Sequence, residues 1–290
     1  MTYEKCELCP RRCGVNRNIT RGFCQGGAKA SVTRSAKHMW EEPVISGKNG
    51  SGTIFFSGCT LRCVFCQNHE ISRKNVGREV TEEELSDIIL SLQEEGAENI
   101  NLVNPVHFAP SVKKALILAR PVIPVVWNSG GYERAETLRE MEGLIDIYLP
   151  DFKYRSEEKA LRYSGVSDYV TNAVEAIKEM YRQTGDVVIE NGMMKKGVLV
   201  RHLVLPSMPL QSVKALRFMK ENLPEGIWVS LMGQYIPTGD VSDTSYPEIN
   251  RKLTRKEYRT VMREYESLGF SGFCQELSSA DEAFVPVLKD

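Results

Sequence analysis

The sequence predicts an α/β protein: a curved, partly open barrel of six β-then-α units over residues 51–290, preceded by a cysteine-rich extension over residues 1–50. Two observations predict this fold. From residue 53 onward, short β-branched runs alternate with amphipathic segments, which implies parallel strands joined by right-handed crossovers. Seven of the eight cysteines fall within the first 66 residues, which sets this part of the chain apart. Six units are too few for a closed eight-fold barrel, and a flat doubly wound sheet is the second candidate.

Each unit of the barrel has a local signature. Residues 53–56 form the first strand, and Thr81 with Glu84 forms a capping box before a helix that continues to Gly96. The remaining strands are expected at residues 100–103, 123–127, 145–149, 198–204 and 228–231. The remaining helices are expected at residues 110–120, 134–142, 156–163, 172–184, 211–222 and 254–268. In either architecture the functional site lies at the carboxyl ends of the strands.

Composition narrows the class of protein. Hydrophobic residues make up 42% of the chain and charged residues 26%, which is ordinary globular usage and excludes a disordered or fibrous protein. No apolar run approaches the roughly 20 residues that cross a bilayer, and the first residues lack the apolar core of a secretory signal. We therefore expect a cytoplasmic protein with no membrane partner. In that compartment, clustered cysteines indicate metal ligands rather than disulfides.

The net charge of −1 hides an asymmetry. Residues 1–37 contain eight lysines and arginines but only two acidic residues, Glu4 and Glu7. A basic segment can mark nucleic-acid binding, but here the positive charge is interleaved with four cysteines. We interpret it first as compensation for thiolates around a metal, and second as a docking surface for an acidic partner. Nucleic acid is the least favoured partner.

The segment Gly58–Asn68 carries the strongest chemical signal. Cys59, Cys63 and Cys66 follow directly after the first strand, with a C-x3-C-x2-C spacing. Three thiolates within eight residues can converge on one [4Fe-4S] cluster but cannot supply a fourth ligand, so one iron stays open for a reactive cofactor. The alternative is a Cys₃His zinc site completed by His69. The position at a strand's carboxyl end favours the cluster, because a structural zinc site has no need to lie there.

This spacing, with the aromatic Phe65 before the third cysteine, resembles the signature of the radical S-adenosylmethionine (radical SAM) enzymes. The segments His38–Pro43, Ser57–Cys59 and Ile147–Tyr154 are similar to a branch related to the pyruvate formate-lyase activating enzymes. The resemblance implies a six-unit partial barrel, iron–sulfur chemistry and S-adenosyl-L-methionine (SAM) as cofactor. It also implies that one electron from the reduced cluster cleaves SAM to methionine and a 5′-deoxyadenosyl radical, so no side chain is itself the radical source.

The same resemblance implies cofactor-binding residues at the other strand ends. Asp151 and Lys153 match an Asp-x-Lys motif that contacts the methionine end, although a surface ion pair is the alternative. Asn128 and Ser129 stand where activating enzymes carry Asp-Thr-Asn-Gly, with an amide in place of the acid. Gln234, after the sixth strand, either bonds the ribose or caps the strand.

Four further residues are considered on physical grounds or as departures from the family. Arg201 lies in an otherwise apolar strand and needs an anionic partner, whereas His202 faces the opposite side and can simply point outward. Where the family usually carries Gly-Gly-Glu, this chain has Asn104 and His107, which we expect to meet the cofactor. His107 could equally be a substrate-side or structural histidine.

The amino-terminal cysteines form a second candidate metal site. Cys6, Cys9, Cys13 and Cys24 supply four thiolates, which suit either a closed zinc site or a fully ligated iron–sulfur cluster. Spacing does not choose between the two metals. Cys274 is expected to be a buried hydrophobic residue, and Glu276 is a candidate substrate contact.

The leading hypothesis is an oxidoreductase-type radical SAM enzyme that installs a glycyl radical on a partner enzyme and receives electrons from a donor such as flavodoxin or ferredoxin. A second hypothesis keeps the chemistry but makes the substrate a small molecule or another peptide. A third, from another class, is a zinc-binding adaptor whose basic N-terminus binds RNA or acidic protein. The chain has no Walker A loop, no G-x-G-x-x-G, no H-E-x-x-H and no serine nucleophile elbow.

Overall fold

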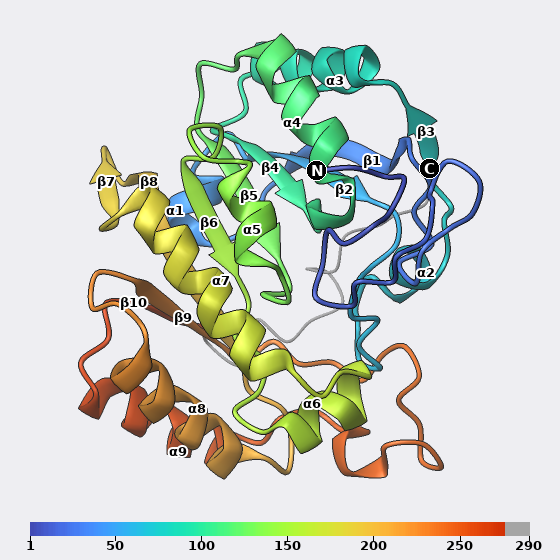
Figure 1. The fold of residues 1–290 in the computed structure, drawn as a ribbon. Helices are drawn as coiled ribbons and strands as arrows, with labels where there is room; N and C mark the ends of the chain where they lie inside the picture. The colour runs from blue at the N-terminus through green and yellow to red at the C-terminus, as the bar shows by residue number, and fades with distance from the viewer. Residues whose placement is uncertain (276–290) are drawn as a thin grey trace.

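Parallel strands and their crossover helices form the predicted partial barrel in a computed structural model that describes residues 1–275 (Figure 1). The six strands of the expected units are β2 (Ser51–Phe56), β4 (Ile100–Val103), β5 (Val125–Ser129), β6 (Ile147–Pro150), β8 (Met193–Leu203) and β9 (Trp228–Met232). The helices that follow them are α3 (Glu82–Glu94), α4 (Ala109–Ala119), α5 (Ala135–Arg139), α6 (Glu157–Ser164), α7 (Tyr169–Thr184), α8 (Pro209–Asn222) and α9 (Arg255–Ser267). Figure 1 shows these helices on the outside of the sheet.

Further strands extend this sheet at its ends. They are β1 (Ala30–His38), β3 (Arg78–Val80), β7 (Val188–Glu190) and β10 (Gly272–Cys274). Within the described residues the order is β10-β9-β8-β6-β5-β4-β2-β1-β3, with β7 paired to β8. The run from β10 to β2 is parallel, whereas β1 is antiparallel to both β2 and β3. The path has two ends, so the barrel is unclosed. The sheet nevertheless curls, because Phe55 of β2 and Met232 of β9 line the same cavity.

Local chemistry explains where the elements depart from the expected ranges. The third strand begins at Val125 rather than at residue 123, since Pro124 has no N–H to donate to a ladder. The helix expected at residues 134–142 ends at Arg139 and continues as tight turns to Gly143, whose φ is +79°. Asn191 and Gly192 both have positive φ, which is typical of the tight hairpin turn that joins β7 to β8. The sequence analysis did not anticipate this hairpin.

A short helix from the first 50 residues plugs the interior of the barrel. Helix α1 (Pro43–Ser46) places Val44 and Ile45 against lumen-facing residues of three strands. Those residues are Val126, Ile147, Leu149 and Leu199. Pro43 occupies the first helical turn, where its missing N–H is not needed. Val126 and Ile147 lie near the amino ends of β5 and β6, so the plug occupies that end of the lumen. The cavities lined by Asp151 and Arg201 lie toward the carboxyl ends of the strands.

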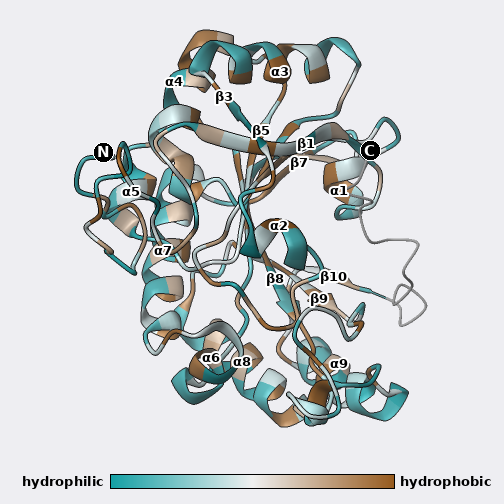
Figure 2. Cartoon of the chain, turned by 90° about the vertical axis from the view of Figure 1, so that its right-hand side faces the viewer, coloured by the Kyte–Doolittle hydropathy of each residue, from teal (hydrophilic) through white to brown (hydrophobic). Residues whose placement is uncertain are grey.

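The outer helices are amphipathic. Figure 2 shows hydrophobic and hydrophilic stretches alternating along α3 and α9, as expected for helices with one face on the sheet and the other in solvent. Helix α3 buries Leu85, Ile89 and Leu92 in the main core between helices and sheet. Its expected capping box is present, because Thr81 and Glu84 exchange side-chain and backbone hydrogen bonds. Nothing in residues 1–275 provides a helix both long and apolar enough to span a membrane.

Candidate active site

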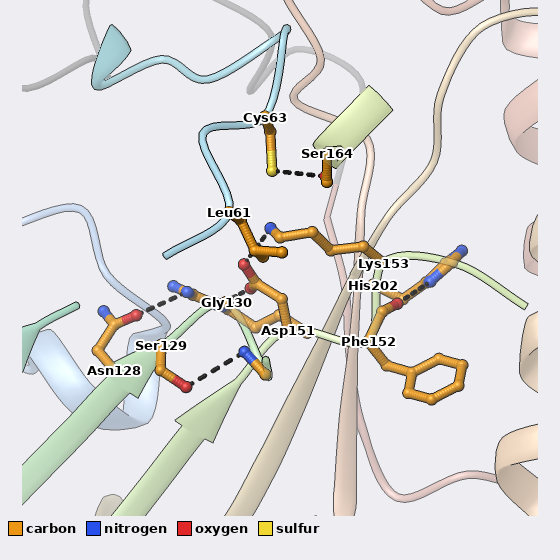
Figure 3. A network of polar contacts seen from close by, with 12 residues as sticks. Leu61, Cys63, Asn128, Ser129, Gly130, Asp151, Phe152, Lys153, Ser164 and His202 are labelled. Atoms are coloured by element: carbon orange, nitrogen blue, oxygen red, sulfur yellow. Dashed lines mark hydrogen bonds and ion pairs between the residues drawn. The ribbon is translucent and has the colours of Figure 1, made fainter. Parts of the chain in front are cut away.

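The loop Gly58–Asn68, which we call the cluster loop, joins the carboxyl end of β2 to α2 (His69–Arg73). Cys63 is buried, and its Sγ lies 2.9 Å from the Ser164 hydroxyl, as Figure 3 shows; Cys59 and Cys66 are partly exposed. Burial raises the pKa of Cys66 to about 12, and the thiols of Cys63 and Cys59 act in the same direction. The three thiols are therefore close enough to oppose one another's ionisation. A bound cationic centre would reverse this effect and stabilise thiolates.

The three thiols suit a cluster better than a single ion. Among the residues described, neither these thiols nor those of the amino-terminal cysteines already converge on the position of a single ion, so this finding alone does not choose between the two sites' metals. Zinc would draw its ligands to about 2.3 Å, but the ring of His69 instead bonds Asp240, with 3.2 Å between Nε2 and Oδ1. A four-iron cube holds its thiolates at separate corners and needs more room. Cys59, Cys63 and Cys66 all line one cavity of about 160 Å³, so the donor set fits such a cluster.

A line of alternating charges lies beside the cluster loop and is called here the charged cluster: Lys153, Asp151, Arg201 and Glu41. Lys153 Nζ lies 2.5 Å from Asp151 Oδ2, and Arg201 Nε lies 3.0 Å from Asp151 Oδ1. Figure 3 shows Lys153 reaching Asp151 beneath the loop that carries Leu61 and Cys63. Although burial acts to raise it, Arg201 and Lys153 hold the pKa of Asp151 below its usual value. The partly buried Arg201 thus has the anionic partner that its position in β8 required.

Glu41 and Glu42 directly precede the plug helix, and their side chains lie in the site. Neither residue was predicted from the sequence to have a role there. Arg201 Nη1 lies 3.3 Å from Glu41 Oε2, and the Asn128 amide donates to Glu41 Oε1 over 3.2 Å. Glu42 is buried and accepts a 2.9 Å hydrogen bond from the Ser230 hydroxyl. Burial raises the pKa of Glu42 despite the nearby Arg201. Two consecutive acids between Trp40 and Pro43 are the sequence signal that could have revealed them.

The other residues predicted for cofactor binding divide into two groups. Phe65, Asn128 and Gln234 line a cavity at the strand ends, about 240 Å³ in volume, together with the charged cluster. Asn104 and Ser129 line the adjoining cavity beside the thiols. Asn128 is not free there, because its Oδ1 accepts a 2.7 Å hydrogen bond from Arg201. Phe65 packs edge-on against Tyr163 and Tyr235, which fixes its ring in the cavity wall.

His107 is not among the residues that line these cavities. It is buried, and its Nε2 donates a 2.7 Å hydrogen bond to the carbonyl of Ser57. Burial lowers the pKa of His107 to about 3, so the ring is neutral at physiological pH. Asn104 also holds the cluster loop, because its amide donates to the Gly58 carbonyl over 2.7 Å. Of the two residues in place of Gly-Gly-Glu, only Asn104 is brought to the cavity.

Glu133 holds the carboxyl end of β5 through two hydrogen bonds, and its burial leads us to predict an effect of pH on stability. It is buried and accepts hydrogen bonds from Trp127 Nε1 at 2.8 Å and from the Ser129 hydroxyl at 3.0 Å. Burial raises its pKa to about 7 from the ordinary 4.5, although both hydrogen bonds act to lower it. The folded protein therefore keeps a proton that the unfolded chain loses in this window, and the free energy of unfolding falls as pH rises through it.

Glu133→Gln should remove this pH dependence. The neutral amide can accept from Trp127 and donate to Ser129, so the fold keeps both contacts. We expect the variant to exceed the wild type at pH 8 by roughly 2–3 kcal/mol in free energy of unfolding, with little difference at pH 4.5. Urea unfolding at the two pH values measures this. Parallel pH profiles for the two proteins would contradict the assignment.

The four amino-terminal cysteines lie close to one another and form what we call the four-cysteine site: Cys6, Cys9, Cys13 and Cys24. Cys13 is exposed and the other three are buried. A Cβ on Gly22 would lie 3.4 Å from Cys13 Sγ and 3.5 Å from Cys24 Sγ, so these two thiols flank the same point. Burial raises the pKa of Cys9 to about 12, and the other three thiols of the site also act to raise it. The four thiols therefore share one location.

Of the eight lysines and arginines in residues 1–37, Arg17 is the one that is buried. Arg17 is 2% exposed and donates to the carbonyls of Gly26, Gly27 and His107. Its Nη1 lies 3.8 Å from Cys6 Sγ. An arginine buried against thiols and carbonyls agrees with charge compensation and is not available to a nucleic acid.

Three predictions for individual residues need comment. Cys274 is exposed at the edge strand β10, so the expectation of a buried hydrophobic residue is wrong; few atoms cover that edge within the described residues. His202 does not point outward: it is 2% exposed, and its Nδ1 lies 2.6 Å from the Phe152 carbonyl oxygen (Figure 3). Glu276 lies outside the described residues.

Gly58 has no room for a side chain, which predicts a large effect of a small substitution. Its φ is +86°, and a Cβ would overlap the carbonyl oxygen of Cys24. Gly58→Ala should lower the free energy of unfolding by roughly 2–4 kcal/mol, through backbone strain and this overlap together. Gly143→Ala is the matched control, because Gly143 has φ +79° but nothing within 4 Å of its Cβ position. Equal losses in the two variants, measured by urea unfolding, would show that the Cys24 contact is unimportant.

Comparisons with known proteins show the family of this chain. The family model described as the Radical SAM superfamily matches residues 53–218. An uncharacterized protein of Methanocaldococcus jannaschii is 33% identical over 272 residues, which cover 90% of this chain and 74% of that protein. Among solved structures, methylornithine synthase (PylB) has a TM-score of 0.48 and 15% identity over 77% of this chain and 70% of its own. Streptococcus suis SuiB bound to S-adenosylmethionine has a TM-score of 0.47 and 13% identity over 77% and 46%, respectively.

Proposed function

Because this chain belongs to the radical SAM superfamily, we propose that Cys59, Cys63 and Cys66 hold a [4Fe-4S] cluster and that the adjoining cavity binds S-adenosylmethionine. When bound, the reduced cluster would supply the electron that cleaves SAM to methionine and a 5′-deoxyadenosyl radical. The observation that carries this proposal is the charged cluster, which lies at the carboxyl ends of β6 and β8 in cavities lined also by the cluster loop. Three thiols without a fourth leave an open coordination position for the cofactor.

The cavity residues match the chemistry of SAM. Its methionine end carries an ammonium and a carboxylate, and its sulfur is cationic. Lys153, Asp151, Arg201 and Glu41 present positive and negative groups in alternation along one wall, so a zwitterion can find a partner of each sign. Phe65, Leu203, Leu205 and Met232 supply apolar surface on the same cavity for the adenosyl end. Gln234 offers an amide that could bond a ribose hydroxyl.

The finer proposal is that the enzyme abstracts hydrogen from a backbone glycine of a partner, as an activase does. The barrel is unclosed between β10 and β3 in the described chain, which leaves a side for an extended peptide. Five carboxamides line the cavity: Gln67, Asn68, Asn128, Gln234 and Gln275. Neutral amides that both donate and accept are the groups that pair with a peptide backbone. A low-potential electron carrier, flavodoxin or ferredoxin, would reduce the cluster.

The activase proposal is tested by incubating reduced protein and SAM with extract of the host. We expect an oxygen-sensitive, carbon-centred doublet in the electron paramagnetic resonance (EPR) spectrum of a protein fraction, and backbone cleavage of that partner on exposure to air. Protein with Cys59 replaced by alanine is the matched control and should give neither signal. Deoxyadenosine coupled only to a small-molecule product, with no protein radical, would overturn the activase role and leave the radical chemistry standing.

We also propose that the four-cysteine site holds a metal, either zinc or an iron–sulfur cluster. Its support is the convergence of four mostly buried thiols and the arginine that faces one of them. Metal and iron content of a Cys59, Cys63 and Cys66 triple alanine variant distinguishes the two choices. A variant that binds no metal would contradict the site.

A further inference from the structure

The four-cysteine site is built directly against the cluster loop. The Cys24 carbonyl occupies the space where Gly58 would carry a side chain, and Gly58 immediately precedes Cys59. On the other side of Cys59, Arg11 Nε donates to the Thr60 carbonyl over 2.5 Å. The contacts therefore flank the first cysteine of the loop on both sides.

Arg62 connects the two sites by a second route. It lies in the cluster loop with φ +59°, donates to the Phe23 carbonyl, and places its guanidinium 4.3 Å from the centre of the Phe23 ring. Phe23 is the neighbour of Cys24. Burial and Arg73 lower the pKa of Arg62, whereas the thiols of Cys24 and Cys59 both act to raise it. One guanidinium therefore lies within electrostatic range of a thiol from each site.

A third route passes beneath the loop. Arg17 contacts Cys6 Sγ and donates to the carbonyl of His107, and the His107 ring bonds the carbonyl of Ser57. Ser57 is the residue before Gly58. This gives the buried His107 a role in the fold that does not involve the cofactor. All three routes end on residues 57–62, and none ends on the charged cluster.

We propose that a thiolate-bound metal centre in the four-cysteine site positions the cluster loop, and that Arg62 is the positioning residue that links them. This inference rests on the proposed function, since the loop is the part of the protein that would hold the radical cluster. Without its metal, the four-cysteine site would contain buried thiols with no partner, and its backbone would lose the constraint that holds Phe23 and Cys24 in place. The residues on either side of Cys59 would then lose their contacts with the four-cysteine site. The effect is the same as when a metal ligand loses the groups that orient it.

The proposal corrects a simpler expectation. From the sequence alone, removing Cys9 should loosen residues 1–37 to proteolysis and leave the cluster at Cys59 able to bind its cofactor. The contacts of Cys24, Phe23 and Arg11 with the loop predict instead that the cluster loop is affected too. Cys9 is the informative residue to change, because it belongs to the four-cysteine site but makes none of these contacts.

The test compares Cys9→Ser, Arg62→Ala and Arg62→Lys with Cys274→Ser, which removes an exposed cysteine at the edge of the sheet. Zinc and iron per chain, the EPR spectrum of the reduced cluster with and without SAM, the Kd for SAM and the rate of deoxyadenosine formation are measured for each. Cys9→Ser should lose the metal of the four-cysteine site, and its affinity for SAM should fall about tenfold with an altered EPR spectrum. Arg62→Ala should keep that metal and show the same defect in SAM binding, which Arg62→Lys should partly restore.

The outcomes separate two failures. If the wild type cleaves no SAM, the proposed function fails. If the wild type cleaves SAM and Cys9→Ser, having lost its metal, matches Cys274→Ser in spectrum and affinity, only the positioning role is overturned. An Arg62→Ala protein indistinguishable from wild type would also overturn it. Loss of zinc in Cys9→Ser identifies a zinc ion at the four-cysteine site, whereas loss of iron identifies an iron–sulfur cluster. Either loss supports the inference when the variant also binds SAM more weakly.

Discussion

Replacing Cys59, Cys63 or Cys66 by alanine is expected to abolish formation of 5′-deoxyadenosine from SAM. Three thiols are the minimum that hold a four-iron cluster with one open iron, and among the described residues the His69 ring that could replace one of them bonds Asp240. Each variant should also lose iron after anaerobic reconstitution. Chromatography of the acid-quenched reaction measures deoxyadenosine, and a colorimetric assay measures iron.

Cys274→Ser is the matched control for these variants, because Cys274 is exposed on β10 and is not among the residues that line the cavities at the strand ends. It should keep the iron and the activity of the wild type. Undiminished cleavage of SAM in any of the three alanine variants would refute the cluster assignment. Equal losses in the control would show that cysteine removal acts through general instability.

Asp151→Ala and Lys153→Ala are expected to leave the cluster in place and to weaken SAM binding by about 10- to 100-fold. Asp151 stands at the centre of the charged cluster, with Lys153 at 2.5 Å and Arg201 at 3.0 Å. Removing it leaves the partly buried Lys153 and Arg201 without the anion between them, which displaces both from the cavity wall. Iron content, together with the Kd for SAM from equilibrium dialysis, separates the two effects.

Arg217→Ala is the control, because it removes an ion pair that lies outside the candidate site. Arg217 pairs with Glu264 at 2.7 Å on the exposed surface between α8 and α9, and such pairs contribute roughly 0–1 kcal/mol. SAM binding in that variant should equal wild type. Loss of iron in Asp151→Ala or Lys153→Ala would mean that these residues support the cluster loop rather than the cofactor.

Local patterns predicted the barrel well. The six strands and their helices follow from β-branched runs and helical periodicity, and the Thr81 capping box marks the start of α3. The Asn191-Gly192 dipeptide, flanked by the apolar residues Val187–Ile189 and Met193–Met194, is a local hairpin signal that was not used in predicting the fold. The short strand β10 was missed because three residues give too little periodicity to detect.

The site was predictable only in part. Asp151, Lys153 and Arg201 stand at strand ends, where the alternation of strands and helices brings residues distant in sequence together. Glu41 could not be found in this way, because its partner Arg201 is 160 positions away and Glu41 precedes a plug helix that belongs to no β-then-α unit. From its position, His107 was expected to be a cofactor contact, a substrate-side group or a structural histidine. Its burial and its bond to Ser57 favour the structural alternative.

The contact between the two cysteine groups was also beyond sequence reasoning. Cys24 and Gly58 are separated by the whole of β1, α1 and β2, and no spacing rule relates them. Their proximity follows from the antiparallel pairing of β1 with β2, which returns the chain to the end of the barrel where the cluster loop begins. Gly58, which has a positive φ and no side chain, is the local feature that permits this close approach.

The most direct test of the central claim is a single anaerobic reaction of the reconstituted wild-type protein. The cluster is reduced with dithionite, SAM is added, and the EPR spectrum is recorded before deoxyadenosine and methionine are quantified. The account predicts that SAM changes the spectrum of the reduced cluster and that the two products appear in equal amounts. A reducible cluster whose EPR spectrum does not change when SAM is added, with no deoxyadenosine formed, would contradict the account.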